Sequence, residues 1–259
     1  MSALWRHGVR LLSLIVLSAL ALQLYFVARV GLMTVVDPQS TTFQRSEIRR
    51  LVAEQQQLLW SQQWVGRERI SDHLKRAVIA SEDASFVDHS GVEWDALEKA
   101  WEKNQRAEAQ AEKINERLAR QATRSQRPAA VKPPAVPKIV GGSTITQQLA
   151  KNLFLAGERN LARKGQEFLI TFMLEALLSK QRILEIYLNN VEWGEGLFGA
   201  EAAARHYFHV SASQLGSFAA ARLAVMLPAP KRFEKRPGSA YVMGRAATVA
   251  ARMGAVELP

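Results

Sequence analysis

An uncharged apolar run near the N-terminus constrains this 259-residue chain more than any other feature. Leu11 to Ala28 contains no charged residue and is long enough to cross most of a bilayer core as a helix. Arg6 and Arg10 precede it, which predicts an anchor whose N-terminus stays in the cytoplasm. The alternative is a cleaved signal peptide, with a small-residue site at Ala19-Leu20-Ala21. Because the apolar run continues beyond that site, the anchor is favoured.

Charge and cysteine content narrow the possible partners. The formal charge is +10, which favours anionic partners such as nucleic acid, an acidic membrane surface or a phosphorylated substrate. No helix-turn-helix, zinc-finger or RNA-binding signature is present, and an anchored chain argues against a nucleic-acid partner. Cysteine is absent, so neither a disulfide nor a thiolate nucleophile contributes.

The remaining chain reads as one mainly helical domain behind the anchor. Residues 1–40 form the cytoplasmic tip and the transmembrane helix, 41–69 a juxtamembrane linker, and 70–259 the folded domain. Amphipathic or apolar helix patterns recur throughout this domain, and no strand signal with a period of two stands out. Trp60 and Trp64 in the linker are expected either at the membrane interface or packed on the domain.

A basic insertion interrupts the domain at about residues 103–138. Its first half has the composition of a solvated helix, and its second half is rich in proline, as in Lys132-Pro133-Pro134. The two interpretations are an inert loop and a contact with anionic lipid head groups.

Two motif matches are weak. Residues 194–200 fit the glycine pattern of dinucleotide-binding sites, but no acidic residue follows at the required distance and no βαβ series surrounds the match. A loop between two helices is the better interpretation. His206 and His209 are three residues apart without a third metal ligand nearby, which predicts two surface histidines.

Three polar blocks carry most of the chemistry: residues 81–91, 141–152 and 163–167. The first offers carboxylates, and the other two offer amides and cations. This combination suits the activation of a hydroxyl group and the stabilisation of a departing phosphate.

These blocks resemble motifs of the glycosyltransferase family that polymerises bacterial cell-wall glycan from lipid II. Glu82-Asp83-x-x-Phe86-x-x-His89-x-Gly91 resembles the first motif, residues 141–152 the second, and Arg163-Lys164-x-x-Glu167 the third. Residues 182–189 and 223–230 resemble the fourth and fifth. The resemblance runs from about Ile70 to Arg232, and the type it resembles is the monofunctional biosynthetic peptidoglycan transglycosylase.

The resemblance implies a lysozyme-like, mainly helical glycosyltransferase domain without transpeptidase activity. It implies that lipid II is polymerised into β-1,4 glycan with inversion and release of undecaprenyl diphosphate. The implied partners are lipid II, the growing glycan, the bilayer, and other cell-wall synthases or division proteins. The implied location is a bacterial inner membrane with the catalytic domain in the periplasm.

The family motifs also imply roles for single residues. Glu82 is the candidate base for the acceptor hydroxyl, and partial burial beside Asp83 is expected to raise its pKa. Glu167 matches a second essential glutamate, which orients the donor or holds a divalent cation, Mg²⁺ or Mn²⁺; the alternative is a structural pair with Lys164. No organic cofactor is implied. The remaining candidates are substrate-binding residues: Asp83, Phe86, His89, Ser143, Gln147, Gln148, Lys151, Asn152, Arg159, Arg163 and Lys164.

Two departures and two rival functions remain. The stretch between the first and second motifs is usually short, and His209 stands where relatives often have glycine. The histidine is expected to alter a turn and not the chemistry.

One rival function is a lytic enzyme on a lysozyme-like fold, which would need an acid for the leaving sugar and no phosphate clamp. The other is a non-catalytic membrane-anchored scaffold.

Overall fold

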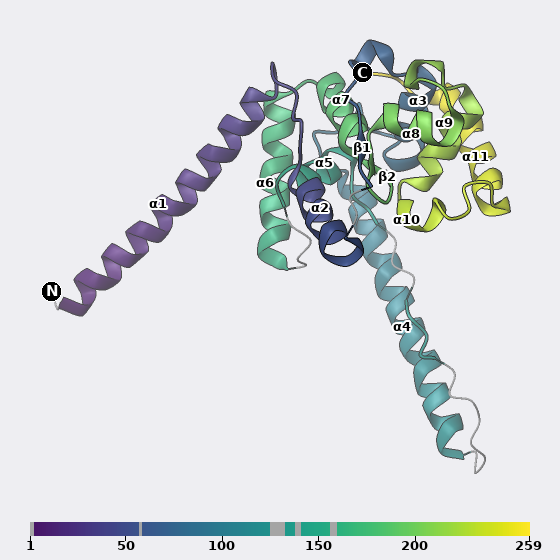
Figure 1. The fold of residues 1–259 in the computed structure, drawn as a ribbon. Helices are drawn as coiled ribbons and strands as arrows, with labels where there is room; N and C mark the ends of the chain where they lie inside the picture. The colour runs from purple at the N-terminus through teal and green to yellow at the C-terminus, as the bar shows by residue number, and fades with distance from the viewer. Residues whose placement is uncertain (1–2, 57–58, 125–132, 138–140, 156–159) are drawn as a thin grey trace. The chain divides into compact units, whose positions relative to one another are not determined.

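The computed structural model describes residues 3–56, 59–124, 133–137, 141–155 and 160–259 (Figure 1). The described chain is mainly helical, as the sequence predicts. It divides into two compact units, one formed by Met1–Gly91 with Thr144–Pro259 and the other by Val92–Ser143.

The larger unit contains most of the helices and three short strands. The helices are α1 (Ala3–Leu32), α2 (Thr42–Gln55), α3 (Asp72–Glu82), α5 (Ile145–Phe154), α6 (Leu161–Leu177), α7 (Lys180–Asn190), α8 (Ala200–Phe208), α9 (Ser217–Met226), α10 (Pro230–Phe233) and α11 (Ala240–Arg252). Single 3-10 turns lie at η1 (Arg67–Arg69), η2 (Ala212–Gln214) and η3 (Met253–Ala255). The strands are β1 (Ser61–Gln62), β2 (Glu192–Gly194) and β3 (Leu197–Phe198).

Side-chain caps explain where many of these helices begin. A hydroxyl or amide oxygen immediately before the helix accepts a hydrogen bond from a backbone N–H of the first turn, which satisfies a donor that has no partner within the helix. The residues that cap in this way are Thr41, Ser71, Thr144, Asn160, Ser179 and Ser239. The starts of α2 and α5 are reinforced by capping boxes with Gln44 and Gln147.

The strands form a small sheet in the order β1-β3-β2. The predicted loop over residues 194–200 is in fact part of an antiparallel hairpin between α7 and α8. Gly196 lies in its turn with φ of +70°, and Gly199 lies between β3 and α8 with φ of +83°, conformations that glycine adopts easily. A Cβ atom at Gly196 would lie 1.9 Å from the carbonyl oxygen of Leu59. The glycine pattern therefore reflects hairpin geometry, not a nucleotide site.

The segment predicted as a linker packs into the larger unit. Helix α2 lies against α5 and buries Leu51 completely. Strand β1 pairs in parallel with β3, and the Trp60 ring stacks on Phe198 with centroids 4.6 Å apart. Of the two interpretations of Trp60, packing on the domain is the one that the structure shows.

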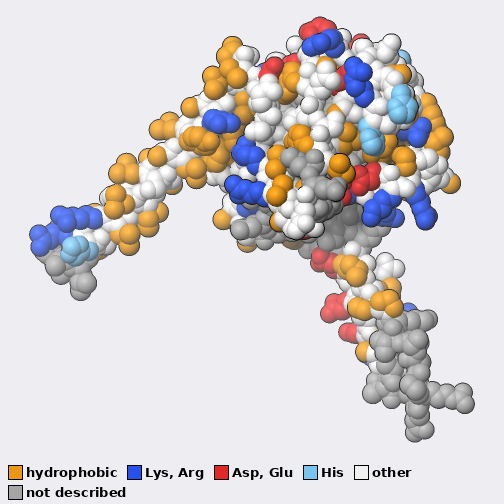
Figure 2. Space-filling model, in the orientation of Figure 1, with side chains coloured by type: hydrophobic (Ala, Val, Ile, Leu, Met, Phe, Trp, Pro, Cys, Tyr) orange, Lys and Arg blue, Asp and Glu red, His pale blue; other side chains and the backbone are white. Residues whose placement is uncertain are grey.

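Helix α1 is both a candidate membrane span and a packing element. Trp5–Leu32 is long and apolar enough to cross a membrane, by length and composition. Apolar side chains follow its length and basic ones gather at its N-terminal end (Figure 2). Its C-terminal part buries Phe26 and Val30 in the core of the larger unit, and Met33 directly after it is buried there too. The amides of Gln23 and Gln166 on α6 exchange hydrogen bonds of 2.9 and 3.1 Å.

This packing predicts that two truncations will differ. Removal of residues 1–21 keeps the buried face of α1, whereas removal of residues 1–33 eliminates Phe26, Val30 and Met33. Full burial of such side chains contributes about 1.5–3 kcal/mol each. We expect the longer truncation to lower the free energy of unfolding by at least about 3 kcal/mol relative to the shorter one. Unfolding in detergent measures this difference, and equal stability would show that α1 is only a tether.

One departure from the resembling family has a local structural consequence. His209 ends α8 with φ of +58°, a left-handed conformation that glycine adopts most easily. The departure therefore affects a turn. His206 and His209 are both exposed, as predicted, and neither belongs to a group of three metal-binding side chains among the described residues.

The smaller unit consists mainly of one long helix, α4 (Trp94–Arg124). The first half of the insertion is therefore helical, as predicted. The Asn115 side chain donates to the carbonyl of Ala135 (3.1 Å) and accepts from its N–H (2.6 Å), which fixes the short described stretch 133–137 against the helix. The predicted lipid contact around Lys132 falls on residues outside those that the structure describes.

Candidate active site

Glu82 lies at the C-terminal end of α3 and is half-buried. The Gln148 amide of α5 donates from Nε2 to Glu82 Oε2 at 3.1 Å. Burial raises the pKa of Glu82 above its ordinary value, and the Asp83 charge acts in the same direction; hydrogen bonds from Gln148 and Ser81 oppose this. A raised pKa makes this carboxylate a stronger proton acceptor than an exposed glutamate, which suits a general base.

Asp83 and His89 form an internal network beneath Glu82. His89 accepts a hydrogen bond at Nδ1 from the N–H of Gly91 (3.1 Å), so its proton is on Nε2, which donates to Asp83 Oδ1 at 2.8 Å. The other oxygen, Asp83 Oδ2, accepts from the backbone N–H of Ile145 at 2.9 Å. Asp83 is buried with both oxygens engaged. This geometry attaches the start of α5 to α3, and the contact of Asp83 and His89 with substrate stays a prediction.

Phe86 and Gln147 are buried and held by other parts of the larger unit. Phe86 has no exposed surface, and the Lys180 ammonium lies 4.5 Å from its ring centroid. Gln147 is 1% exposed, and its Oε1 accepts from the N–H of Thr144 at 3.0 Å as part of the capping box. Their contact with substrate stays a prediction.

Gly91 is the point where the first motif meets α5 and α6. Its carbonyl accepts a hydrogen bond of 2.6 Å from the Thr144 hydroxyl, and its φ is +87°. A Cβ atom here would lie 2.7 Å from Thr171 Cγ2 and 2.8 Å from Glu175 Cγ. Only glycine satisfies both the conformation and the space.

We expect Gly91→Ala to destabilise the protein by about 2–4 kcal/mol, because backbone strain and overpacking add. Gly244→Ala is the matched control, since its Cβ atom would meet nothing within 4 Å on helix α11. The control should be neutral or more stable by about 0.5–1 kcal/mol. Thermal or urea unfolding measures both variants, and equal stability of the two would contradict the crowding at Gly91.

Three charged residues of the third motif lie together on α6. Glu167 is 3% exposed and accepts from Arg163 Nη1 at 3.2 Å and from the Lys164 ammonium. The pairing with Lys164 that the sequence offered as an alternative is therefore present, with Arg163 as a second partner. The cations themselves remain partly exposed. One buried acid thus holds two cations in adjacent positions.

Three more of the predicted substrate-binding residues lie on or near α5. Lys151 is exposed in the last turn of α5, and Asn152 beside it is half-buried. Ser143 is exposed and belongs to the smaller unit. Arg159 falls outside the described residues, so its role stays a prediction.

Helix α5 connects the acid to the cations. Gln148 contacts Glu82, Asp83 holds the N-terminus of α5, and α5 packs against α6 and α7. From α7, the buried Tyr187 donates its hydroxyl hydrogen to Gln148 Oε1 at 3.0 Å. The sequence predicted no role for Tyr187, although it lies within the block that resembles the fourth motif.

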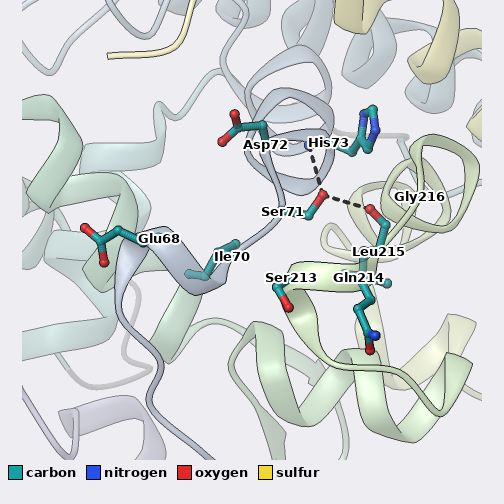
Figure 3. A pocket seen from close by; sticks show the side chains of 9 residues that line it. All are labelled: Glu68, Ile70, Ser71, Asp72, His73, Ser213, Gln214, Leu215 and Gly216. Atoms are coloured by element: carbon teal, nitrogen blue, oxygen red, sulfur yellow. Dashed lines mark hydrogen bonds between the residues drawn. The ribbon is translucent and has the colours of Figure 1, made fainter.

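A separate pocket of 530 Å³ lies at the opposite end of α3 from Glu82 (Figure 3). It is lined by η1, the first turn of α3 and the segment from η2 to Gly216, with Ser71 donating to the carbonyl of Leu215 at 2.8 Å. None of the predicted site residues that the structure describes lines it. We therefore assign the candidate active site to the α3–α5–α6 region.

Comparison with known proteins identifies the family. The profile of the family described as Transglycosylase matches residues 49–127 and 126–254. A biosynthetic peptidoglycan transglycosylase of Burkholderia thailandensis is 49% identical over 240 residues, covering 93% of this chain and 83% of the relative. Proteins of the same description from Paraburkholderia phytofirmans and Herminiimonas arsenicoxydans are 47% and 48% identical, covering 98% and 94% of this chain and 94% of each relative. The chain belongs to the transglycosylase family, as its motifs indicated.

Proposed function

We propose that this chain is a peptidoglycan glycosyltransferase that polymerises lipid II. The relatives are named for transglycosylation in peptidoglycan biosynthesis. One observation carries the proposal for this chain. Helix α5 links the half-buried carboxylate of Glu82, whose pKa is raised, to two adjacent cations on α6, Arg163 and Lys164. Sugar transfer from a diphosphate needs both: a base for the acceptor and positive charge for the leaving group.

In this mechanism Glu82 takes the proton of the acceptor 4-hydroxyl as that oxygen attacks the anomeric carbon of the donor. The new C–O bond forms on the face opposite the diphosphate, the bond to the diphosphate oxygen breaks, and the α configuration becomes β. No covalent enzyme intermediate is required. Gln148 supports the reaction by donating to Glu82 Oε2, which holds the carboxylate in place for the incoming proton.

Arg163 and Lys164 are the proposed diphosphate clamp, with Lys151 as a further cation. A guanidinium group binds phosphate oxygens through two parallel hydrogen bonds, and an ammonium acts as a compact charge. Glu167 would hold the first two cations in place while leaving a net positive charge for the diphosphate. By its family resemblance Arg159 is proposed as another member of the clamp.

The residues around Glu167 do not fit a metal ion held by the protein alone. Its two oxygens each accept from a cation of its own helix. Among the residues that the structure describes, Glu167 belongs to no group of three potential metal-binding side chains. We therefore derive no step through Mg²⁺ or Mn²⁺.

We further propose that the chain is a single-pass protein of a bacterial inner membrane. Helix α1 supports membrane anchoring by its length and composition. Arg6 and Arg10 support a cytoplasmic N-terminus, which would leave the domain in the periplasm beside its lipid-linked substrate. Other cell-wall synthases or division proteins are proposed partners.

The direct test uses the full-length protein in detergent with labelled lipid II. Formation of polymer supports the proposal. Shortening of preformed glycan without polymer formation would support a lytic enzyme, and the absence of both reactions would support a scaffold.

A further inference from the structure

The orientation of the Gln148 amide is decided by Tyr187. The amide has one end that donates and one that accepts, and rotation by 180° exchanges them. In the structure Nε2 donates to Glu82 Oε2 (3.1 Å) and Oε1 accepts from the Tyr187 hydroxyl (3.0 Å). Both bonds are made only when the N–H end faces Glu82 and the phenol donates its hydrogen.

The rotated amide would have the opposite effect on Glu82. Its oxygen would face the carboxylate, and two acceptors attract only if one of them carries a proton. The rotated form therefore favours protonated Glu82, and the observed form favours ionised Glu82. The phenol is suited to select the observed form, because burial and the nearby carboxylates of Glu82 and Asp83 raise the pKa of Tyr187 well above its ordinary value and keep its hydrogen in place.

We propose that Tyr187 is a positioning residue for glycosyl transfer, which holds the Gln148 amide with its N–H toward Glu82 and so keeps that carboxylate ionised and aimed. The proposal rests on the role of Glu82 as the base. Tyr187 is 1% exposed and lies on α7, so it acts through Gln148 and not by touching substrate.

The charged and titratable groups around Glu82 come from the first motif and from the helices that pack on α3. On the side of the first motif, Asp83 is bonded to His89 and to the N–H of Ile145. Helix α5 contributes Gln148, and α7 contributes Tyr187. Helices α9 and α11 also pack against α3, and their arginines stay charged throughout. The titratable side chains on these two helices are Arg222, Tyr241, Arg245 and Arg252.

The test is the pH dependence of kcat/KM for lipid II in Tyr187→Phe, which removes the hydroxyl and keeps the ring. We expect the acid-side decline of kcat/KM to move to higher pH, with a loss of about tenfold on the acid side that shrinks as pH rises. Tyr207→Phe is the matched control, because it also removes a single tyrosine hydrogen bond (2.9 Å, to the carbonyl of Trp193) but has no link to Glu82. Its acid-side decline should remain at the wild-type pH.

Gln148→Met tests whether Tyr187 acts on Glu82 through the Gln148 amide or only through the general effect of losing a buried hydroxyl. This variant should move the acid-side decline as Tyr187→Phe does, and Tyr187→Phe should add nothing in the Gln148→Met background. A wild-type pH profile in either single variant, or additive effects in the double variant, would overturn the proposal, and Gln148→Met decides even if Tyr187→Phe does not fold. If Glu82→Gln retained activity, the assignment of the base would fail instead, so the two failures are distinguishable.

Discussion

Replacement of Glu82 by glutamine is expected to reduce lipid II polymerisation by at least about 10²-fold, the usual contribution of a general base. Glutamine is nearly isosteric and cannot take the proton of the acceptor hydroxyl. Because Glu82 is only half-buried and ends its helix, the variant should unfold at nearly the wild-type temperature. Single-turnover assays with labelled lipid II, normalised to folded protein, measure the effect.

Glu68→Gln is the matched control for this change. Glu68 is an exposed glutamate in η1 and lines the pocket at the other end of α3 (Figure 3). Its replacement should leave polymerisation within about twofold, as for a surface change away from the chemistry. If Glu68→Gln were inactive and Glu82→Gln active, the site would have to be moved to that pocket.

The pH dependence of the wild-type enzyme follows from the same residue. Glu82 works as a base only when ionised, so kcat/KM must fall as pH drops through its pKa. Burial raises that pKa above the ordinary value for glutamate, which places the decline closer to neutrality than an exposed glutamate would.

Local signals allowed the helices to be predicted from sequence. Apolar residues recur at helical spacing along α3, and the candidate base Glu82 follows as its last residue. These features depend on residues three or four positions apart, which one sequence displays directly.

The sequence was least informative where distant residues decide the outcome. The Phe86 ring lies against Lys180 of α7, a contact that its motif does not reveal. The hairpin over residues 192–198 was missed because its strands are too short to show a period of two, and its partner β1 lies far earlier in the chain. Tyr187 had no visible role because its hydroxyl meets Gln148 only after α5 and α7 have packed.

Replacement of Glu167 by glutamine tests whether the third motif is a working clamp or a structural ion pair. The change removes the acceptor charge of a buried group that holds Arg163 and Lys164. Because both cations are partly exposed, water will compensate for part of the loss, and we expect a stability cost of about 1–2 kcal/mol. Glu102→Gln on α4, which breaks an exposed pair with Arg106, should cost less than about 0.5 kcal/mol.

The sign of the effect on donor use separates the two roles. If Glu167 only lowers the local positive charge, its removal leaves more attraction for the diphosphate, and KM should fall. If it places the two cations, they lose their common acceptor, and a displacement of about 1 Å is enough to cost about 10² in rate. We expect the second result, a loss of about 10²-fold in kcat/KM at a temperature where the variant is folded.

A double-variant cycle assigns this loss to the clamp. If Glu167 acts by placing Arg163, then Arg163→Ala should weaken donor use on its own, by a few kcal/mol, but add little in the Glu167→Gln background. Additive losses would mean that Glu167 contacts the donor independently of Arg163. Wild-type kcat/KM in Glu167→Gln, together with reduced stability, would show that the ion pairs of Glu167 with Arg163 and Lys164 are only structural. The third motif would then have no part in the mechanism.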